Sequence, residues 1–169
     1  MKAAVFYGPN QPLKVEEVPM PVIGAGEILV KVAACGLCHT DIGYIDHGTP
    51  TFKKPPLILG HEISGTVYEI APDVTTFKVG DHVLSPAVFA CGECNPCREG
   101  RGNTCEKMKM FGNDVDGGYA EYVEDLKLEK AINQEELEKA LHPEAKHLGG
   151  GWYEYKGEKM RKADLPNGS

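Results

Sequence analysis

The stretch that decides the fold is residues 27–41, EILVKVAACGLCHTD. Residues 27–34 are rich in branched apolar side chains and give the clearest strand pattern in the chain. A polar run that contains Cys38 follows at once. We therefore expect a buried strand that leads into a short helix over residues 38–45, with polar and metal-ligating side chains at the junction.

Shorter strand patterns lie on both sides of this stretch. We expect further strands over residues 2–7, 13–18, 63–70, 81–84 and 117–123, and irregular loops over 48–56 and 91–106. Twenty glycines and twelve prolines punctuate the chain, which favours turns and short strands over long helices. The sequence thus predicts a mainly β, barrel-like domain with short helices.

Four cysteines fall in the predicted 91–106 loop, at Cys91, Cys94, Cys97 and Cys105. The spacing Cys-x2-Cys-x2-Cys-x7-Cys lets consecutive thiolates face one ion, and four thiolates suit a tetrahedral structural zinc. Metal binding would also stabilise a loop that has no core of its own. Disulfides or free thiols are the plain alternative. An iron–sulfur cluster is the sharper one, but the fourth cysteine comes too late for the ferredoxin spacing and no proline follows it.

A second group of metal-ligating side chains combines Cys38 with His61 and its neighbour Glu62. Thiolate, imidazole and carboxylate are ligands of catalytic zinc sites, which keep one position open for water or substrate. A lone cysteine and a lone histidine are more often ordinary structural residues. The neighbouring Thr40 and Asp41 favour a site, because such side chains can orient ligands or carry protons.

The composition excludes two classes of partner. The formal net charge is -7, whereas nucleic acids and anionic membrane surfaces require clustered lysine and arginine. No apolar stretch approaches the length of a membrane span, and the apolar run at the N-terminus is too short for a signal peptide. We therefore expect a cytoplasmic protein, in which clustered cysteines bind metal.

Several motifs, in order along the chain, carry a family resemblance. Residues 60–74 fit the pattern Gly-His-Glu-x2-Gly-x5-Ala-x2-Val, and residues 36–41, the four-cysteine loop and residues 117–122 accompany it. With these motifs the chain resembles the medium-chain zinc-dependent alcohol dehydrogenases throughout residues 1–124. The resemblance implies a GroES-like, partly open β-barrel over residues 1–125, with a structural-zinc loop.

The resemblance also implies a set of metal ligands. Cys38 and His61 would be two ligands of the catalytic zinc, and Glu62 would lie near that metal as an exchangeable ligand. The structural zinc would be bound by Cys91, Cys94, Cys97 and Cys105.

Three more residues take roles by the same resemblance. Thr40 would hydrogen-bond the substrate alcohol and begin the removal of its proton. Asp41 would hold His61 from outside the ligand shell, and His39 would lie near the cofactor phosphates. In this family the alcohol is oxidised to an aldehyde or ketone, and a hydride passes to NAD(P)+.

The chain departs from the family pattern in three respects. No glycine fingerprint of a Rossmann domain occurs, because the glycine run at 149–151 follows no predicted strand. No cysteine follows Cys105, so the family's third catalytic ligand is missing or replaced. The only later histidines are His142 and His147, and exposure in a tail is their simpler interpretation. Gly43 stands where the family usually has a proton-relay histidine.

Residues 126–169 do not resemble the family and are predicted to form a separate tail. We expect a short helix over 134–141, a glycine joint at 149–151 and a hairpin over 152–161. Aromatic side chains such as Trp152 anchor interfaces, so the tail is either a partner-binding module or a segment that packs on its own barrel.

Two functional hypotheses follow from these patterns. The first is the zinc-binding part of an alcohol dehydrogenase, not competent alone, whose NAD(P)-binding domain comes from another chain. The second is a non-catalytic structural or interaction module, stabilised by zinc and derived from such an enzyme. A chaperonin-like role would rest on shared fold alone. An apolar barrel face predicts a homo-oligomer or a partner chain. The patterns do not identify the small alcohol or carbonyl substrate, or choose between NAD and NADP.

Overall fold

The computed structural model describes residues 1–125, 132–133, 146–149, 152–155 and 158–161. The chain divides into two compact units, Met1–Ala131 and Ile132–Ser169. Among the described residues, no helix is both long and apolar enough to cross a membrane.

A small antiparallel sheet opens the first unit. β1 (Lys2–Phe6) lies between β2 (Lys14–Glu17) and β4 (Leu57–Ile58). The strands expected over 2–7 and 13–18 are therefore confirmed. β4 was not predicted, because a strand this short beside a proline-rich loop leaves no period in the sequence.

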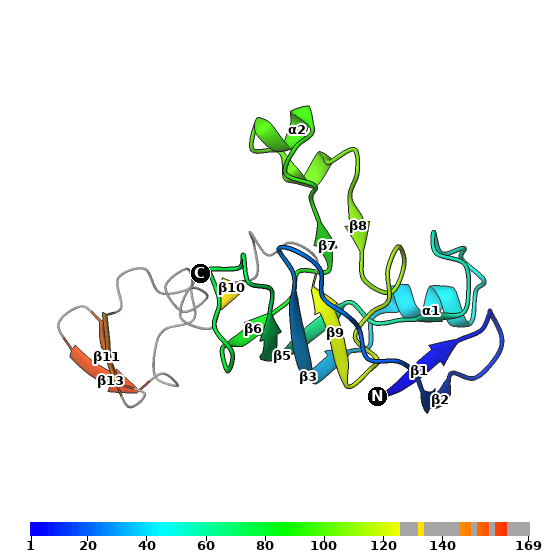
Figure 1. The fold of residues 1–169 in the computed structure, drawn as a ribbon, viewed down its shortest axis with the longest axis horizontal. Coiled ribbons are helices and arrows are strands. Elements are labelled where there is room, and N and C mark those ends of the chain that lie inside the picture. Colours follow the sequence, from blue (N-terminus) through cyan, green and yellow to red (C-terminus); the bar gives the residue numbers. More distant parts are fainter. Residues whose placement is uncertain (126–131, 134–145, 150–151, 156–157, 162–169) are drawn as a thin grey trace. The chain divides into compact units, whose positions relative to one another are not determined.

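The larger sheet contains the strand expected over residues 27–34. β6 (His82–Leu84), β5 (Glu62–Ile70), β3 (Ile28–Gly36) and β9 (Tyr122–Asp125) are neighbours in that order, and each of these pairs is antiparallel. This confirms the strands expected over 27–34, 63–70 and 81–84. Among the described residues the strands close no barrel, and the first unit is mainly β as predicted (Figure 1).

The strand expected over residues 117–123 is wrong in its limits. β9 begins only at Tyr122. Residues 117–119 instead donate backbone hydrogen bonds of 2.8–3.0 Å to the carbonyl oxygens of residues 58–60. A side chain at Gly117 would overlap that backbone, so glycine is required for the close crossing. The two segments are therefore held together immediately before His61.

Buried side chains form clusters around these sheets. The largest cluster lies on the larger sheet and comprises Ile28, Val30, Ile63, Val67, Phe77, Val83, Phe111 and Val123. A second cluster packs Tyr44 of the helix α1 (His39–Ile45) against Phe6, Leu57 and Leu59. The helix predicted over 38–45 is confirmed, and this packing fixes its position at the end of β3.

A hairpin stem carries the four-cysteine segment away from the sheets (Figure 1). β7 (Val88–Phe89) pairs with β8 (Lys109–Met110), and the rings of Phe89 and Phe111 meet edge to face with centroids 4.4 Å apart. The expectation of a wholly irregular loop over 91–106 is wrong. The segment contains the one-turn helix α2 (Asn95–Arg98) and a 3-10 turn, η1 (Gly102–Thr104).

The second unit holds the remaining strands, β10 (Ile132–Asn133), β11 (Lys146–Gly149), β12 (Trp152–Tyr155) and β13 (Glu158–Arg161). β12 pairs with β11 and β13, both antiparallel, which confirms the hairpin expected over 152–161. The expectation that the glycine run follows no strand is wrong, because Gly149 ends β11. The helix predicted over 134–141 lies outside the described residues.

Candidate metal centres

Cys38, His61 and Glu62 come together where β3 leads into α1 and β5 begins. One ligand atom from each lies within 4.8 Å of the other two. A tetrahedral zinc with bonds of about 2.0–2.3 Å holds its ligand atoms roughly 3.5 Å apart, so small side-chain movements bring this set to bonding geometry. The residues that the sequence analysis grouped as a catalytic metal site are therefore neighbours in space.

His61 carries the clearest sign of a missing partner. The residue is 4% exposed, and its Nδ1 atom is buried without a hydrogen-bond partner among the described residues. The nearest carboxylate oxygen, Oδ1 of Asp41, is 3.8 Å away. An orphaned buried ring nitrogen is destabilising, and ordering of the imidazole by a metal and a nearby carboxylate is one way to satisfy it. The site thus fits a metal ion in both donor type and burial.

Asp41 is fully buried and fixes the backbone beside two of the ligands. Its Oδ2 accepts a hydrogen bond of 3.0 Å from the backbone N–H of Cys38, and its Oδ1 accepts one of 3.2 Å from the N–H of Gly60. The predicted contact to His61 is longer, at 3.8 Å. The carboxylate therefore positions the chain at both Cys38 and Gly60, the residue before His61.

The two other predicted site residues flank Cys38 on α1. Thr40 is half-buried, and its Oγ1 lies 3.7 Å from the Sγ of Cys38. His39 is exposed at the first position of the helix. Of the later histidines considered as a third ligand, His142 lies outside the described residues, and His147 is placed only as part of β11.

Sequence reasoning missed Tyr119, which it read as part of a strand. Its hydroxyl lies 3.0 Å from Oδ2 of Asp41 and 3.2 Å from the carbonyl oxygen of Gly36. Burial and the Asp41 carboxylate raise the pKa of Tyr119 well above its ordinary value, so the hydroxyl remains a proton donor. No local pattern signals this role, since these partners are 78 and 83 residues away in sequence.

The second centre lies in the segment between β7 and β8, residues 90–108, which we call the cysteine lobe. The sulfur atoms of Cys91, Cys94, Cys97 and Cys105 all lie within 4.8 Å of one another. Cys94 is 3.3 Å from Cys97 and 3.9 Å from Cys105, measured between Sγ atoms. Cys94 also begins α2 as its N-cap residue. The predicted ligand set therefore lies together on the folded lobe.

The backbone around this cluster favours thiolates. Amide donors, first that of Glu93 and then that of Cys94, lower the pKa of Cys91 to about 6. The amides of Glu106 and Cys97 likewise lower the pKa of Cys94. Burial and the neighbouring thiols raise the pKa of Cys97 to about 12. Metal ions bind cysteine in its thiolate form. A close group of cysteines in which some pKa values are lowered is therefore typical of a site for a divalent cation.

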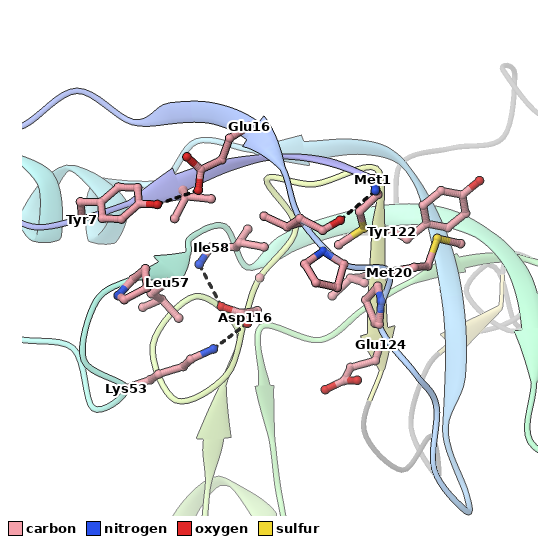
Figure 2. Close-up of a pocket in the computed structure, with 17 residues that line it drawn as sticks. Met1, Tyr7, Glu16, Met20, Lys53, Leu57, Ile58, Asp116, Tyr122 and Glu124 are labelled. Atoms are coloured by element: carbon pink, nitrogen blue, oxygen red, sulfur yellow. Dashed lines mark hydrogen bonds and ion pairs between the residues drawn. The ribbon is translucent and has the colours of Figure 1, made fainter.

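A pocket of about 480 Å³ lies elsewhere on the first unit, lined by β1, the segment after β2, and β9 (Figure 2). An ion pair of 2.6 Å joins Lys53 to Asp116 at its edge. Burial, then the charges of Glu27 and Asp116, raise the pKa of Glu124 in its wall. Its described lining includes none of the candidate metal ligands, so this pocket is separate from both centres.

Known proteins match a large part of this chain. The family model described as the alcohol dehydrogenase GroES-like domain covers residues 24–127. An alcohol dehydrogenase of Geobacillus stearothermophilus is 48% identical over 123 residues, which is 72% of this chain and 36% of that protein. An L-threonine 3-dehydrogenase of Pyrococcus horikoshii is 40% identical over 124 residues, again 72% and 36% of the two chains.

A solved structure gives the same result for the fold. The cobalt- and zinc-bound thermostable alcohol dehydrogenase of Pyrobaculum aerophilum superposes with a TM-score of 0.72 at 32% identity, over 79% of this chain and 41% of that one. This chain spans about a third of the length of the curated relatives that it matches. With the family model covering more than half of its residues, the chain belongs to the alcohol dehydrogenase GroES-like domain family.

Proposed function

We propose that residues 1–125 form the zinc-binding domain of an alcohol dehydrogenase-like oxidoreductase, followed by a tail over 126–169. The observation that carries the proposal is the grouping of the Cys38, His61 and Glu62 ligand atoms within 4.8 Å, beside the orphaned Nδ1 of His61. The complete activity, oxidation of a small alcohol to an aldehyde or ketone with NAD(P)+, is part of the same proposal.

Two zinc ions are proposed for the chain. Cys38 and His61 hold the catalytic ion, with Glu62 as an exchangeable ligand, and Cys91, Cys94, Cys97 and Cys105 hold the structural ion. The Pyrobaculum relative, described as bound to cobalt and zinc, supports metal binding in this fold. A zinc ion at the first site supplies Lewis acidity, which makes an alcohol easier to deprotonate.

The side chains around Cys38 have separate roles in this proposal. Thr40 hydrogen-bonds the alcohol through its Oγ1 atom and passes the proton on, which its position 3.7 Å from the Cys38 sulfur supports. Asp41 holds the backbone at Cys38 and Gly60 so that the ligands stay in place. His39 is exposed beside them and is proposed to face the cofactor phosphates.

We further propose that residues 1–125 do not turn over alcohols by themselves and need an NAD(P)-binding domain. The pairings of β1, β3 and β5 with their neighbours are antiparallel, whereas dinucleotide folds are built on parallel strands. A homo-oligomer or a partner chain, in the cytoplasm, is part of the same proposal, and the exposed side chains of Val22 and Phe52 are candidate contacts.

Zinc per chain tests the proposal, measured by elemental analysis of the full chain purified without added metal. We expect about two ions, one for each ligand set. His61→Ala should remove only the first and Cys105→Ser only the second. Residues 1–125 should form no NAD(P)H from added alcohols, and robust turnover would contradict the claim that they need an NAD(P)-binding domain.

About one ion per chain, unaffected by His61→Ala, would support the alternative function. The chain would then be a zinc-stabilised structural or interaction module without a catalytic metal. The four-cysteine lobe, which is built independently of the Cys38 site, is the observation that favours this alternative.

A further inference from the structure

We propose that Tyr119 is a positioning residue for the Cys38–His61–Glu62 site, because one side chain contacts a neighbour of each of the three ligands. The inference rests on the proposed function of that site as a metal centre, and extends it to a residue that lies in no metal-binding motif.

The first contact is on the Cys38 side. The Tyr119 hydroxyl lies 3.0 Å from Oδ2 of Asp41, the same oxygen that accepts the 3.0 Å hydrogen bond from the Cys38 backbone. A fully buried carboxylate with several acceptor sites needs donors on each side to hold one orientation. Removal of the hydroxyl leaves the Cys38 and Gly60 amides as the remaining donors to Asp41, so the carboxylate is held less firmly beside Cys38.

The second contact is on the Glu62 side. The hydroxyl also lies 3.2 Å from the carbonyl oxygen of Gly36, and Gly36 is the residue opposite Glu62 in the β3–β5 register. Tyr119 thus ties the last residue of β3, which faces Glu62, to the Asp41 carboxylate in α1. The hydroxyl proton thus has two acceptors at similar distance, one in β3 and one in α1, and the hydroxyl links these two elements.

The third contact is on the His61 side and involves the ring. A Cβ atom at Gly60 would lie 2.7 Å from Cδ1 of Tyr119, so the ring packs directly on the backbone before His61. Gly60 has φ +94°, a conformation that suits glycine. Backbone hydrogen bonds of 3.0 Å to the carbonyl of Leu59 and 2.8 Å from the amide of Ala4 hold Tyr119 itself.

The test is Tyr119→Phe in the full chain, which keeps the ring and removes only the hydroxyl. Tyr122→Phe is the matched control, because the Tyr122 hydroxyl makes no hydrogen bond within the described part of the chain and the ring contact with Tyr68 remains. Co²⁺ titration, followed by absorption of the bound ion and by chelator competition, measures both centres in one sample. His61→Ala identifies which binding step belongs to the Cys38 site.

We expect Tyr119→Phe to weaken Co²⁺ binding at the Cys38 site by about 10-fold, the lower end of the effect of losing a residue that orients a ligand, and to shift its visible bands. The four-cysteine centre should keep its wild-type affinity, as an internal control for folding. Tyr122→Phe should change neither centre.

Unchanged affinity and bands in Tyr119→Phe, with two Co²⁺ ions bound by the wild type, would overturn the positioning role and leave the proposed function standing. Equal loss at both centres would also overturn it, because a general folding defect would then explain the change. A wild type that binds only at the four cysteines would overturn the proposed catalytic metal site together with this inference.

A double-mutant cycle with Asp41→Asn tests whether the hydroxyl acts through this carboxylate, with the four-cysteine centre as the control that each variant is folded. If Tyr119 acts through Asp41, the double variant should weaken Co²⁺ binding by clearly less than the product of the two single effects. Independent, multiplicative effects would show that the hydroxyl does not act through this carboxylate, and would overturn the mechanism argued here.

Discussion

Gly36 and Glu62 face each other across the β3–β5 ladder, and any side chain at Gly36 would overlap the Glu62 carboxylate. The absence of a Cβ at this position leaves room for Glu62 to lie beside Cys38 and His61. The glycine at the end of β3 is thus explained by the metal centre, in addition to any effect on the strand.

Gly36→Ala should therefore disturb the metal centre. We expect the alanine methyl to displace the Glu62 carboxylate from the site with little loss of stability, because Glu62 is exposed and its flexible side chain can move aside. Co²⁺ absorption should report a changed ligand set at this site and an unchanged four-cysteine centre. Gly43→Ala is the control, because a Cβ there meets only Thr49 at an ordinary 3.4 Å or more. Wild-type bands in Gly36→Ala would contradict the steric explanation.

Cys105→Ser should remove one metal ion from the chain. Its sulfur lies with those of Cys91, Cys94 and Cys97, and three thiolates bind a structural zinc much less well than four. Elemental analysis should show about one ion fewer, and protease digestion should become faster at the lobe. Cys35→Ala provides the matched control, since Cys35 is a free cysteine outside the cluster and should keep the wild-type metal content.

Phe111→Ala should be strongly destabilising. The ring is fully buried and meets Phe89 edge to face at 4.4 Å, where the stem of the cysteine lobe enters the core. We expect a loss of about 3–5 kcal/mol in the free energy of unfolding, measured in urea. Phe52→Ala, at a side chain that is 84% exposed, should change it by less than about 0.5 kcal/mol. Similar losses in both variants would contradict the assigned core.

Glu124→Gln should raise stability at neutral pH. Burial, then Glu27 and Asp116, raise the pKa of Glu124, so its charged form destabilises the native state above the folded pKa. This penalty disappears as the pH falls through the folded pKa toward the ordinary value of about 4.3. The variant's Tm should exceed that of the wild type at about pH 7, and the difference should shrink toward about pH 5. An equal gain from Glu69→Gln, at an exposed position, would argue for a general charge effect instead.

The sequence predicted regular elements well where a period was present. The strands around residues 27–34 and 63–70 follow from their branched apolar runs, and the cysteine spacing predicted the four-cysteine cluster. The Cys38, His61 and Glu62 group was predicted from ligand type, polar neighbours and the family resemblance. Residues 117–121 misled the prediction, because their alternation resembles a strand while their backbone hydrogen bonds go to residues 58–60 and to β1. Tyr119 could not be predicted, since its contacts depend on how distant segments meet.

The arrangement of the four cysteines along the lobe has a consequence for the continuity of the chain. Cys91, Cys94 and Cys97 precede the exposed residues 98–101, and Cys105 follows them, so an ion bound by all four joins the two sides of this segment. If the peptide were cut near Gly100, the ion would act as a reversible cross-link. After a chelator removed the ion, only the pairing of β7 with β8 would hold the two cut ends together at this segment, while the pairing of β3 with β9 would still join the two fragments.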